Sequence, residues 1–278
     1  MNALPVPLEL WWIWPGILLY AGAAGLAVAA AAPGTAQRAL DRGVLGLFTA
    51  ALGLLAVGIA VRWMRLGHGP FLSLFEILVS SLVTLGVGYA LAWWRLPSIR
   101  RSAAIVLPLL AMMAVWLLVA SPADTHFPPT YETSVLWFHV LFGKLFLACA
   151  LVALGVSGVV LARMRPRFAA SFSRMPADAA LDRLAWRFMR IALVFESLML
   201  IAGAVWAQDA WGRYWAWDPL ETWAFVTWLA LVGALHARLR YRLGPRAGAL
   251  CIVIVFVLAF LTFFGVPFVS TAPHKGAI

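Results

Sequence analysis

The sequence predicts an all-α integral membrane protein, a bundle of about eight transmembrane helices with both termini outside the cytoplasm. Of the 278 residues, 64% are hydrophobic and 12% are charged, whereas a soluble domain is about 45–50% apolar and about 25% charged. The mean hydropathy is +0.93. The apolar residues form long runs, and arginines gather between alternate runs. These observations exclude a soluble enzyme, a disordered chain and a disulfide scaffold.

Eight stretches are long enough to cross a bilayer, which takes about 20 mostly apolar residues. We expect spans at residues 11–32, 43–61, 71–94, 103–120, 134–161, 186–207, 222–239 and 247–268. They must be helices, because unpaired backbone amides cannot face lipid, and the runs are too long and continuous for barrel strands. The loops are mostly short, so residues 1–278 are expected to form one polytopic domain.

The first ten residues contain no Lys or Arg. A cleavable signal peptide begins with a basic region and has a shorter apolar core. The first run is therefore expected to be a true span.

The basic residues predict the orientation, because cytoplasmic loops of membrane proteins are rich in Lys and Arg. Five basic residues lie on one side and its helix ends: Arg62, Arg65, Lys144, Arg213 and Lys275. The other 16 lie in the opposite loops, at positions 38, 42, 95, 100, 101, 163, 165, 167, 174, 183, 187, 190, 238, 240, 242 and 246. Those loops are expected in the cytoplasm. The net charge of +10 then reflects orientation against membrane lipid, and arginines divided over four loops argue against nucleic acid.

The two cysteines, Cys149 and Cys251, lie in separate predicted spans and form neither a CxxC nor a CxxCH motif. The sequence therefore holds no dithiol redox pair and no haem-attachment motif of its own.

The most informative segment is residues 206–223, whose 18 residues include Trp206, Trp211, Trp215, Trp217 and Trp223. It is expected on the outer face, between spans six and seven. An aromatic belt accounts for one or two tryptophans at each helix end. A denser aromatic surface can hold a large flat ligand by stacking. Composition alone leaves both interpretations open.

Part of this segment has a structural explanation. Asp218, Pro219 and Glu221 fit the N-cap, N1 and N3 positions of the seventh helix, where Asp caps, Pro starts a helix and Glu can close a capping box. Asp218 and Glu221 therefore need not be catalytic.

The spacing resembles a known signature. It reads Trp211-Gly212-x-x-Trp215-x-Trp217-Asp218-Pro219-x-Glu221-Thr222-Trp223, followed by Trp228-Leu229 and Leu235-His236. This is similar to the WWD signature of haem-handling proteins in cytochrome c biogenesis. It fits the CcsA (ResC) family, the multi-span subunit of the system II cytochrome c synthase, better than the related CcmC and CcmF families. The resemblance covers spans two to eight and is strongest over residues 203–236.

Histidine is a common haem ligand, and the chain has five: His68, His126, His139, His236 and His274. In the family, an outer histidine before the signature and one after it are the axial ligands of the externally presented haem. His139 and His274 match these positions. Pro267 and Lys275-Gly276 depart from the family's Asn and Ser-Tyr, although the spacing holds. Without the resemblance, the favoured interpretation of either histidine is a polar interface residue.

His236 lies deep in span seven, towards its cytoplasmic end, and an ionisable group inside a membrane is a candidate functional residue. It resembles the family's transmembrane haem ligand, whose opposing ligand comes from a CcsB (ResB)-type subunit. The sequence thus predicts a half-site completed by a partner. The alternative is a polar residue that reaches the inner interface beside Arg238.

The resemblance implies haem b as the cofactor and contacts to it from Trp211, Trp215, Trp217, Asp218 and Trp223. Arg213, in the same segment, is expected to pair with a haem propionate, since arginine binds carboxylates in bidentate fashion. Pairing within the protein is the competing interpretation.

Five further residues are left with structural interpretations. His68 begins Gly67-His68-Gly69-Pro70, with Ser73 and Glu76 following, in a pattern similar to another family segment. We expect a supporting loop there and a surface loop at His126. Glu76, Glu196 and Lys144 fall inside spans, where charged groups pair or line polar cavities.

The resemblance implies haem export and presentation in a bacterial cytoplasmic (inner) membrane, within a holocytochrome c synthase. Reduced haem would enter at a site that includes His236, move to the outer segment, and be attached to the CxxCH motif of apocytochrome c. A haem chaperone or regulator of the same fold without synthase activity remains open. A cytochrome b-type carrier is disfavoured because only His236 is deeply placed, and a transporter because the sequence shows no internal repeat.

Overall fold

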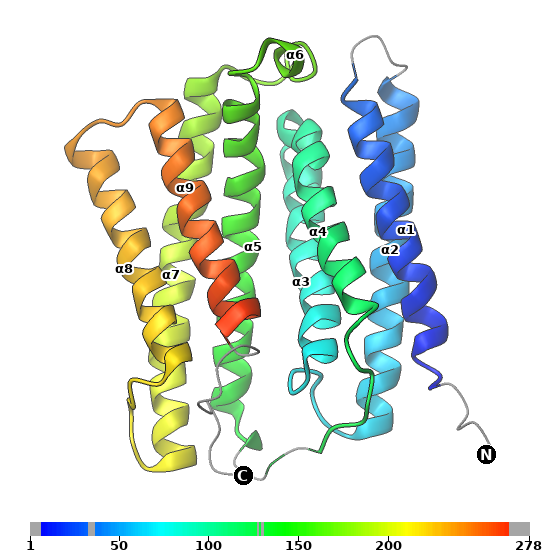
Figure 1. Ribbon diagram of the computed structural model, residues 1–278, viewed down its shortest axis with the longest axis vertical. Helices are drawn as coiled ribbons and strands as arrows, with labels where there is room; N and C mark the ends of the chain where they lie inside the picture. The colour runs from blue at the N-terminus through cyan, green and yellow to red at the C-terminus, as the bar shows by residue number, and fades with distance from the viewer. Residues whose placement is uncertain (1–6, 33–36, 127, 129–130, 267–278) are drawn as a thin grey trace. The chain divides into compact units, whose positions relative to one another are not determined.

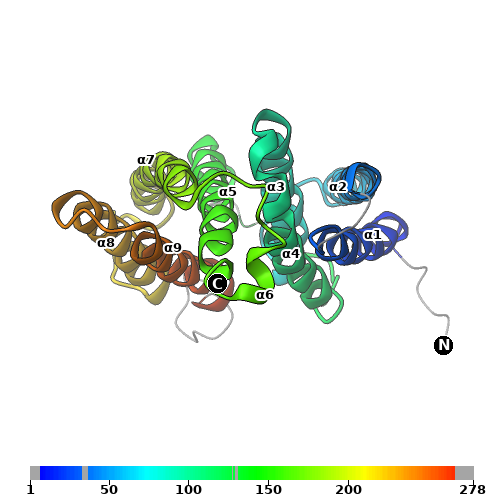
Figure 2. The ribbon, with the colours of Figure 1, turned by 90° about the horizontal axis from the view of Figure 1, so that it is seen from above.

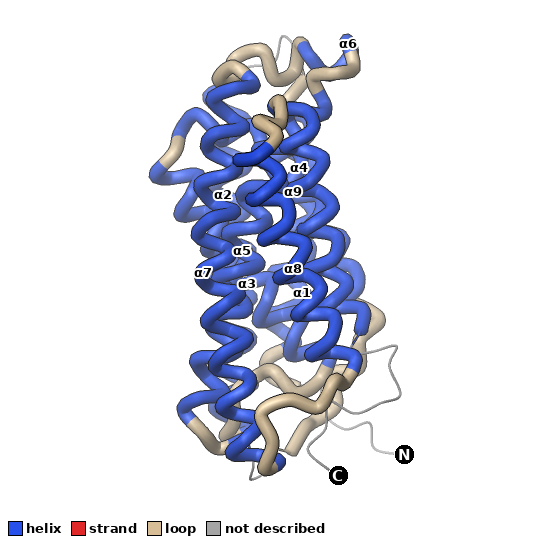
Figure 3. The backbone as a smooth tube through the Cα atoms, turned by 90° about the vertical axis from the view of Figure 1, so that its left-hand side faces the viewer, coloured by secondary structure: helices blue, strands red, loops and turns tan. Residues whose placement is uncertain are grey.

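The computed structural model describes residues 7–32, 37–126, 128 and 131–266. In that part of the chain, eight helices are long and apolar enough to cross a membrane, and no residue is in a strand (Figure 3). The prediction of an all-α, multi-span membrane protein is confirmed. The outer location of the termini and the single-domain organisation stay predictions.

The chain divides into two compact units, residues 1–127 and residues 128–278. The first unit contains α1 (Leu10–Ala30), α2 (Gln37–Leu66), α3 (Leu74–Arg95), the 3₁₀ helix η1 (Pro97–Ser102) and α4 (Ala103–Leu117) (Figure 1). Within it, α1 packs against α2 and α4, and α3 packs against α2 and α4.

Aromatic side chains fill the core of the first unit. The hydroxyl of Tyr20 donates a hydrogen bond to the carbonyl of Leu82 at 3.1 Å, which joins α1 to α3. The ring of Phe48 from α2 meets Tyr20 and Tyr89 edge-on, at centroid distances of 5.5 and 6.3 Å. Three helices thus meet in one aromatic cluster, and the hydroxyl of the fully buried Tyr20 is satisfied in the apolar interior.

The second unit contains α5 (Ser134–Ala162), α6 (Pro166–Ala169), α7 (Asp178–Trp211), α8 (Pro219–Arg240), α9 (Pro245–Phe260) and the π-helical turn η3 (Leu261–Gly265). Helix α5 packs against α7 and α9, and α8 packs against the same two helices from their other side (Figure 2). The long helices run up and down in chain order, so α5 begins at the end where α7 finishes.

The helices extend beyond the predicted spans where polar residues continue a helix outside the apolar run. Helix α7 begins at Asp178, eight residues before the predicted span, so Arg183 lies in a helix and not in a loop. The fourth predicted span is preceded by η1 and ends as an α-helix at Leu117. Hydropathy marks only the part of a helix that crosses lipid, which explains why the helical structure starts earlier than predicted in both cases.

We predict that Gly86→Ala destabilises the first unit by about 1–3 kcal/mol, the usual cost of overpacking a core. A Cβ at Gly86 would lie 2.4 Å from both the Tyr20 hydroxyl and Leu52 Cδ2. Thermal unfolding of the detergent-solubilised protein measures the effect. Gly25→Ala in α1 is the matched control, because nothing lies within 4 Å of its added Cβ. Equal melting temperatures for the two variants would contradict the prediction.

Candidate functional site

His139 lies near the start of α5 and is held against α7. Thr133 caps α5 by accepting hydrogen bonds from the amides of Val135 and Leu136, at 3.2 and 3.4 Å. The imidazole Nδ1 lies 2.8 Å from the carbonyl oxygen of Met199. The ring is half-buried, so this histidine is fixed on a helix and does not hang from a loop.

An aromatic cluster of Trp206, Tyr131 and Trp211 contacts this histidine through Trp206. The ring of Trp206 stacks on His139 with a centroid distance of 6.3 Å and an interplanar angle of 24°. Tyr131 and Trp211 meet Trp206 edge-on, at 5.1 and 5.0 Å. Trp206 is 2% exposed, so it anchors the cluster and is not available as an open stacking surface.

A short loop with special backbone angles follows this cluster. Helix α7 ends at Gly212, whose φ of 71° is left-handed and suits glycine. Trp217 also has a positive φ, 60°, which is rare for a bulky residue and costs about 1–3 kcal/mol. Its side chain is 68% exposed. Strain combined with an exposed aromatic ring is typical of a residue that contacts a ligand.

The cap of α8 closes the loop. As predicted, Asp218 is the N-cap and accepts a hydrogen bond from the Glu221 amide at 2.9 Å. Glu221 does not complete the expected capping box. Its carboxylate accepts from the amide of Ala216 at 2.7 Å instead, because the left-handed turn at Trp217 carries the chain back over the first turn of α8. Both acids therefore shape the loop that carries the tryptophans.

A second aromatic cluster lies under this loop. Trp215 meets Trp217 and Phe225 edge-on, at 5.6 and 6.1 Å. Phe225 in turn stacks on Trp228 at 6.0 Å, and the Trp228 indole donates a hydrogen bond to the Ser197 hydroxyl at 2.9 Å. The loop is thereby supported from α8 and α7.

Two polar groups of this loop have no partner in the described part of the chain. The indole Nε1 of Trp215 is buried and makes no hydrogen bond, although buried donors are normally satisfied. The guanidinium of Arg213 is exposed and forms no ion pair with a described residue. Tyr214, 60% exposed, lies beside it in the chain. The loop thus offers exposed aromatic rings, a cation and an unsatisfied donor, which suits a flat apolar ligand with acidic groups.

The remaining predicted residues lie elsewhere. The side chain of Trp223, 39% exposed, is on the first turns of α8 and joins neither cluster, while its carbonyl accepts from Thr227 and Thr262 at 2.9 and 3.3 Å. His236 lies on α8 roughly 20 Å further along the helix than Trp223, at a rise of about 1.5 Å per residue. Its side chain is exposed. His274 lies outside the described residues.

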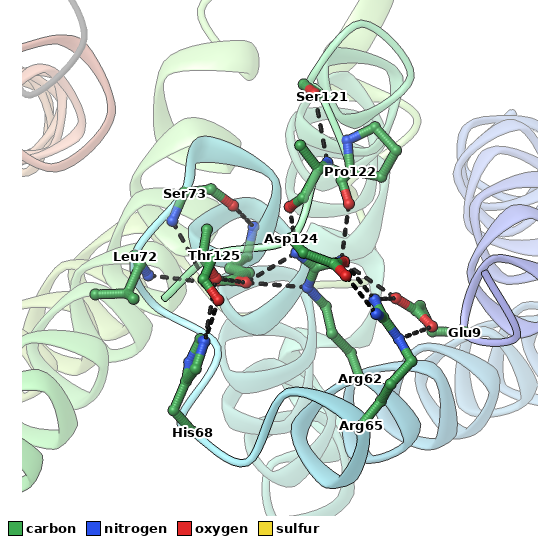
Figure 4. Close-up of polar contacts among 12 residues, drawn as sticks. Glu9, Arg62, Arg65, His68, Leu72, Ser73, Ser121, Pro122, Asp124 and Thr125 are labelled. Carbon is green, nitrogen blue, oxygen red and sulfur yellow. Dashed lines mark hydrogen bonds and ion pairs between the residues drawn. The ribbon is translucent and has the colours of Figure 1, made fainter. Parts of the chain in front are cut away.

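A charged network in the first unit involves residues whose role the sequence left open (Figure 4). Arg62 of α2 is fully buried and lies between two buried acids. Its guanidinium donates to Glu9 at 3.2 Å, to Glu76 at 3.0 Å, and to the carbonyls of Pro122 and Ala123 at 3.0 and 2.7 Å. A buried charge stabilises a protein only when it is paired and fully hydrogen-bonded, and Arg62 meets both conditions.

Glu76 connects this arginine to the neighbouring loops. It closes a capping box with Ser73 at the start of α3, and it accepts a hydrogen bond from the Thr125 hydroxyl at 2.7 Å. The ring of His68 lies 2.9 Å from the Thr125 carbonyl and 3.0 Å from the Gly69 carbonyl. The interpretation of His68 as a supporting residue fits this placement, and Glu76 is paired as expected.

Arg65 extends the network to the surface and shifts the pKa values of two acids outside the helices. Its guanidinium hydrogen-bonds Asp124 at 2.7 Å and lowers the pKa of that carboxyl below its usual range. Burial raises the pKa of Glu9, but hydrogen bonding to Arg65 and the positive charges of Arg65 and Arg62 outweigh this effect, so the net pKa shift is downward. Both acids thus favour the charged form.

Sequence reasoning missed several residues that hold these groups in place. Trp206 was only part of the tryptophan count, and Gly203 only marked where the resemblance becomes strong. Arg62 and Glu9 are 53 residues apart, so no local pattern connects them. The sequence shows only that Glu9 lies just before the first predicted span and that Arg62 lies just after the second. Glu196, 1% exposed, has a carboxylate oxygen with no partner among the described residues.

Comparisons with known proteins all match this chain to proteins of cytochrome c assembly. The family described as "Cytochrome C assembly protein" matches residues 45–274, a range that includes every histidine of the chain. The chain is 28% identical over 251 residues to the cytochrome c biogenesis protein CcsA of Prochlorococcus marinus, covering 80% of each chain. It is 25% identical over 272 residues to CcsA of Nicotiana tomentosiformis, covering 84% of each. A match to CcsA of Cuscuta reflexa, 32% identical over 108 residues, covers 39% of this chain and 35% of that protein.

We predict that Arg62→Leu destabilises the protein by about 3–5 kcal/mol, because it leaves the buried carboxylates of Glu9 and Glu76 uncompensated. The melting temperature of the purified protein measures this. Arg62→Lys keeps the positive charge but not the planar guanidinium. Its melting temperature should therefore lie between those of Arg62→Leu and the wild type. A melting temperature of Arg62→Leu within the error of the wild type would contradict a stabilising role.

The pair of Arg65 and Asp124 predicts a pH dependence. Since the pKa of Asp124 is lowered in the folded protein, the pair stabilises the fold above the ordinary carboxyl pKa of about 4. This contribution is lost as the pH falls through the lower folded value. The decrease in the free energy of unfolding should not exceed about 1 kcal/mol, because the pair is partly exposed. Melting curves from pH 6 to 3 should show a difference between wild type and Asp124→Asn that shrinks with acidification. A constant difference would refute the assignment.

Proposed function

Because the chain belongs to the cytochrome c assembly protein family and takes part in cytochrome c biogenesis as a multi-pass membrane protein, we propose that it presents haem b for covalent attachment to apocytochrome c. Presentation takes place on the outer face of a bacterial cytoplasmic membrane. The chain acts as the CcsA subunit of a holocytochrome c synthase, together with a CcsB (ResB)-type membrane subunit.

The single observation that carries this proposal is the placement of His139. Its imidazole is fixed between Met199 and Trp206 at the end of α7 from which the tryptophan loop continues. A nitrogen ligand for iron therefore lies at the helix end that leads directly into exposed aromatic rings. This combination suits haem, which needs an axial base and a flat apolar surface.

The loop supplies the rest of the binding surface. The exposed indole of Trp217 stacks on the porphyrin and is supported by Trp215, while Trp211 extends the aromatic surface at the preceding helix end. Trp223 borders the same surface on α8, and Asp218 holds the loop by capping that helix. Arg213 pairs with a propionate. These assignments rest on exposure and charge, and each is a proposal for the residue named.

His274 provides the second axial ligand in this scheme, on the basis of its position after the signature. Two histidines fill both axial positions of the iron, which hinders oxygen from reaching it. The protein residues thus contribute orientation and protection, and little acid–base chemistry is required of them.

His236 belongs to a second, membrane-embedded site. It lies on an exposed stripe of α8, and no described residue offers it a hydrogen bond. The stripe comprises Trp223, Val226, Leu229, Gly233 and His236. A histidine that faces outward in a membrane span is costly unless another group meets it. We propose that a histidine of the partner subunit completes this site, through which haem enters before it reaches the outer surface.

The attachment reaction itself needs no external oxidant or reductant beyond a supply of reduced haem. Each cysteine thiol of the CxxCH motif adds its sulfur and its hydrogen across a vinyl double bond, so that a C–S and a C–H bond form. The chain's task is to hold the vinyl edge towards the incoming apocytochrome. In this proposal, Trp217 and the neighbouring aromatic rings set the orientation of the porphyrin plane, and His139 sets the position of the iron.

The absorption spectrum of the purified protein tests this proposal. Wild type should carry a six-coordinate, low-spin haem, and His139→Ala or His274→Ala should lose it, because each removes an axial ligand. His126→Ala is the matched control, since His126 is an exposed loop residue. A wild-type spectrum in both ligand variants would refute the outer site.

The partner requirement has a separate test. With the CcsB-type subunit and an apocytochrome co-expressed, His236→Ala should reduce holocytochrome c by at least about tenfold, because even the loss of a residue that only supports a metal ligand costs about 10–100-fold. Haem bound at the outer site without any covalent product, even with the partner present, would favour a haem chaperone or regulator instead.

A further inference from the structure

The imidazole of His139 packs against a single stripe of α7 formed by three residues. Met199, Gly203 and Trp206 are spaced i, i+4 and i+7, so they lie on one helix face. Met199 provides its carbonyl oxygen, 2.8 Å from Nδ1. Trp206 provides a stacked ring at 6.3 Å. Gly203 provides space between the two.

The space at Gly203 is occupied by the histidine ring. A Cβ at this position would lie 2.8 Å from both Cε1 and Nδ1 of His139, closer than real Cβ atoms approach other atoms. In an α-helix the carbonyl of residue 199 also accepts the amide of residue 203. The histidine therefore uses the second lone pair of that carbonyl, and it reaches the carbonyl only over a residue that has no side chain.

The hydrogen bond determines which ring nitrogen carries the proton. A carbonyl oxygen can only accept, so Nδ1 must donate. A neutral imidazole has one N–H, which leaves the lone pair on Nε2. Neutral imidazole is the form that binds iron, and ligating histidines commonly donate their other N–H to a carbonyl, which fixes the ring and increases ligand basicity.

We infer that Gly203, the Met199 carbonyl and Trp206 form a positioning cradle that selects the Nδ1–H tautomer of His139 and directs Nε2 towards the haem iron. The inference rests on the proposed role of His139 as a haem ligand. Gly203 and Trp206 are positioning residues, which act through His139 and do not bind the metal.

The first test concerns the haem-free protein, so that it is independent of haem binding. Nitrogen-15 NMR of histidine-labelled protein, with His139→Gln for assignment, reports the protonation of each ring nitrogen. Wild type at neutral pH should show Nδ1 protonated and Nε2 unprotonated. Gly203→Ala should lose this preference, because the added methyl group displaces the ring from the carbonyl. An Nε2–H tautomer in the wild type would overturn the inference even if Gly203→Ala does not accumulate.

The second test concerns haem itself. In Gly203→Ala, haem affinity should fall by about 10-fold or more, as for other residues that support a metal ligand, and the midpoint potential of the remaining haem should rise, because a less basic imidazole stabilises ferric iron less. Added imidazole should restore the low-spin spectrum of Gly203→Ala, as it would for a displaced ligand. Gly53→Ala on α2 is the matched control, because nothing lies within 4 Å of its added Cβ.

The outcomes separate the two proposals. Wild-type affinity, potential and tautomer in Gly203→Ala would overturn the cradle while leaving His139 as a ligand. An unchanged haem spectrum in His139→Ala would overturn the proposed function, whatever the tautomer.

Discussion

The close approach of α5 and α7 is the constraint on which the candidate site depends. Each helix has a glycine where the other presents a side chain. At Gly143 of α5, a Cβ would lie 3.0 Å from the Met199 sulfur, and at Gly203 of α7 it would lie 2.8 Å from the His139 ring. Small residues let helix backbones approach closely in membranes, where the hydrophobic effect between helices is absent. The same approach that packs the second unit therefore fixes its histidine.

The two units place their charged groups differently. The first encloses a buried arginine and two buried acids, which is tolerable in a membrane protein only when every donor and acceptor is satisfied. The network ties residues 122–125 to α2 and α3, so the chain that leaves α4 is fixed within the first unit. The second unit buries Glu196 within α7, but it also exposes Arg213 and Trp217 in the loop before α8, where a ligand with charged edges can reach them.

Most of the fold could be predicted from the sequence, because its determinants are local. Apolar runs of membrane length and the alternation of arginines predict eight spans, and Asp218, Pro219 and Glu221 predict the start of α8. Contacts between distant segments could not be predicted. The pairing of Arg62 with Glu9, and of His139 with the Met199 carbonyl, joins residues 53 and 60 positions apart, and only the packing of helices brings them together. The left-handed turn at Trp217 was equally hidden, since no local pattern favours a positive φ for tryptophan.

The most direct test of the account is an experimental structure of the haem-loaded protein in complex with its CcsB-type partner. The account predicts that Nε2 of His139 binds the iron while Nδ1 remains within hydrogen-bonding distance of the Met199 carbonyl, and that Trp217 lies against the porphyrin face. Haem bound at the outer face through another residue, or iron bound to Nδ1, would contradict it.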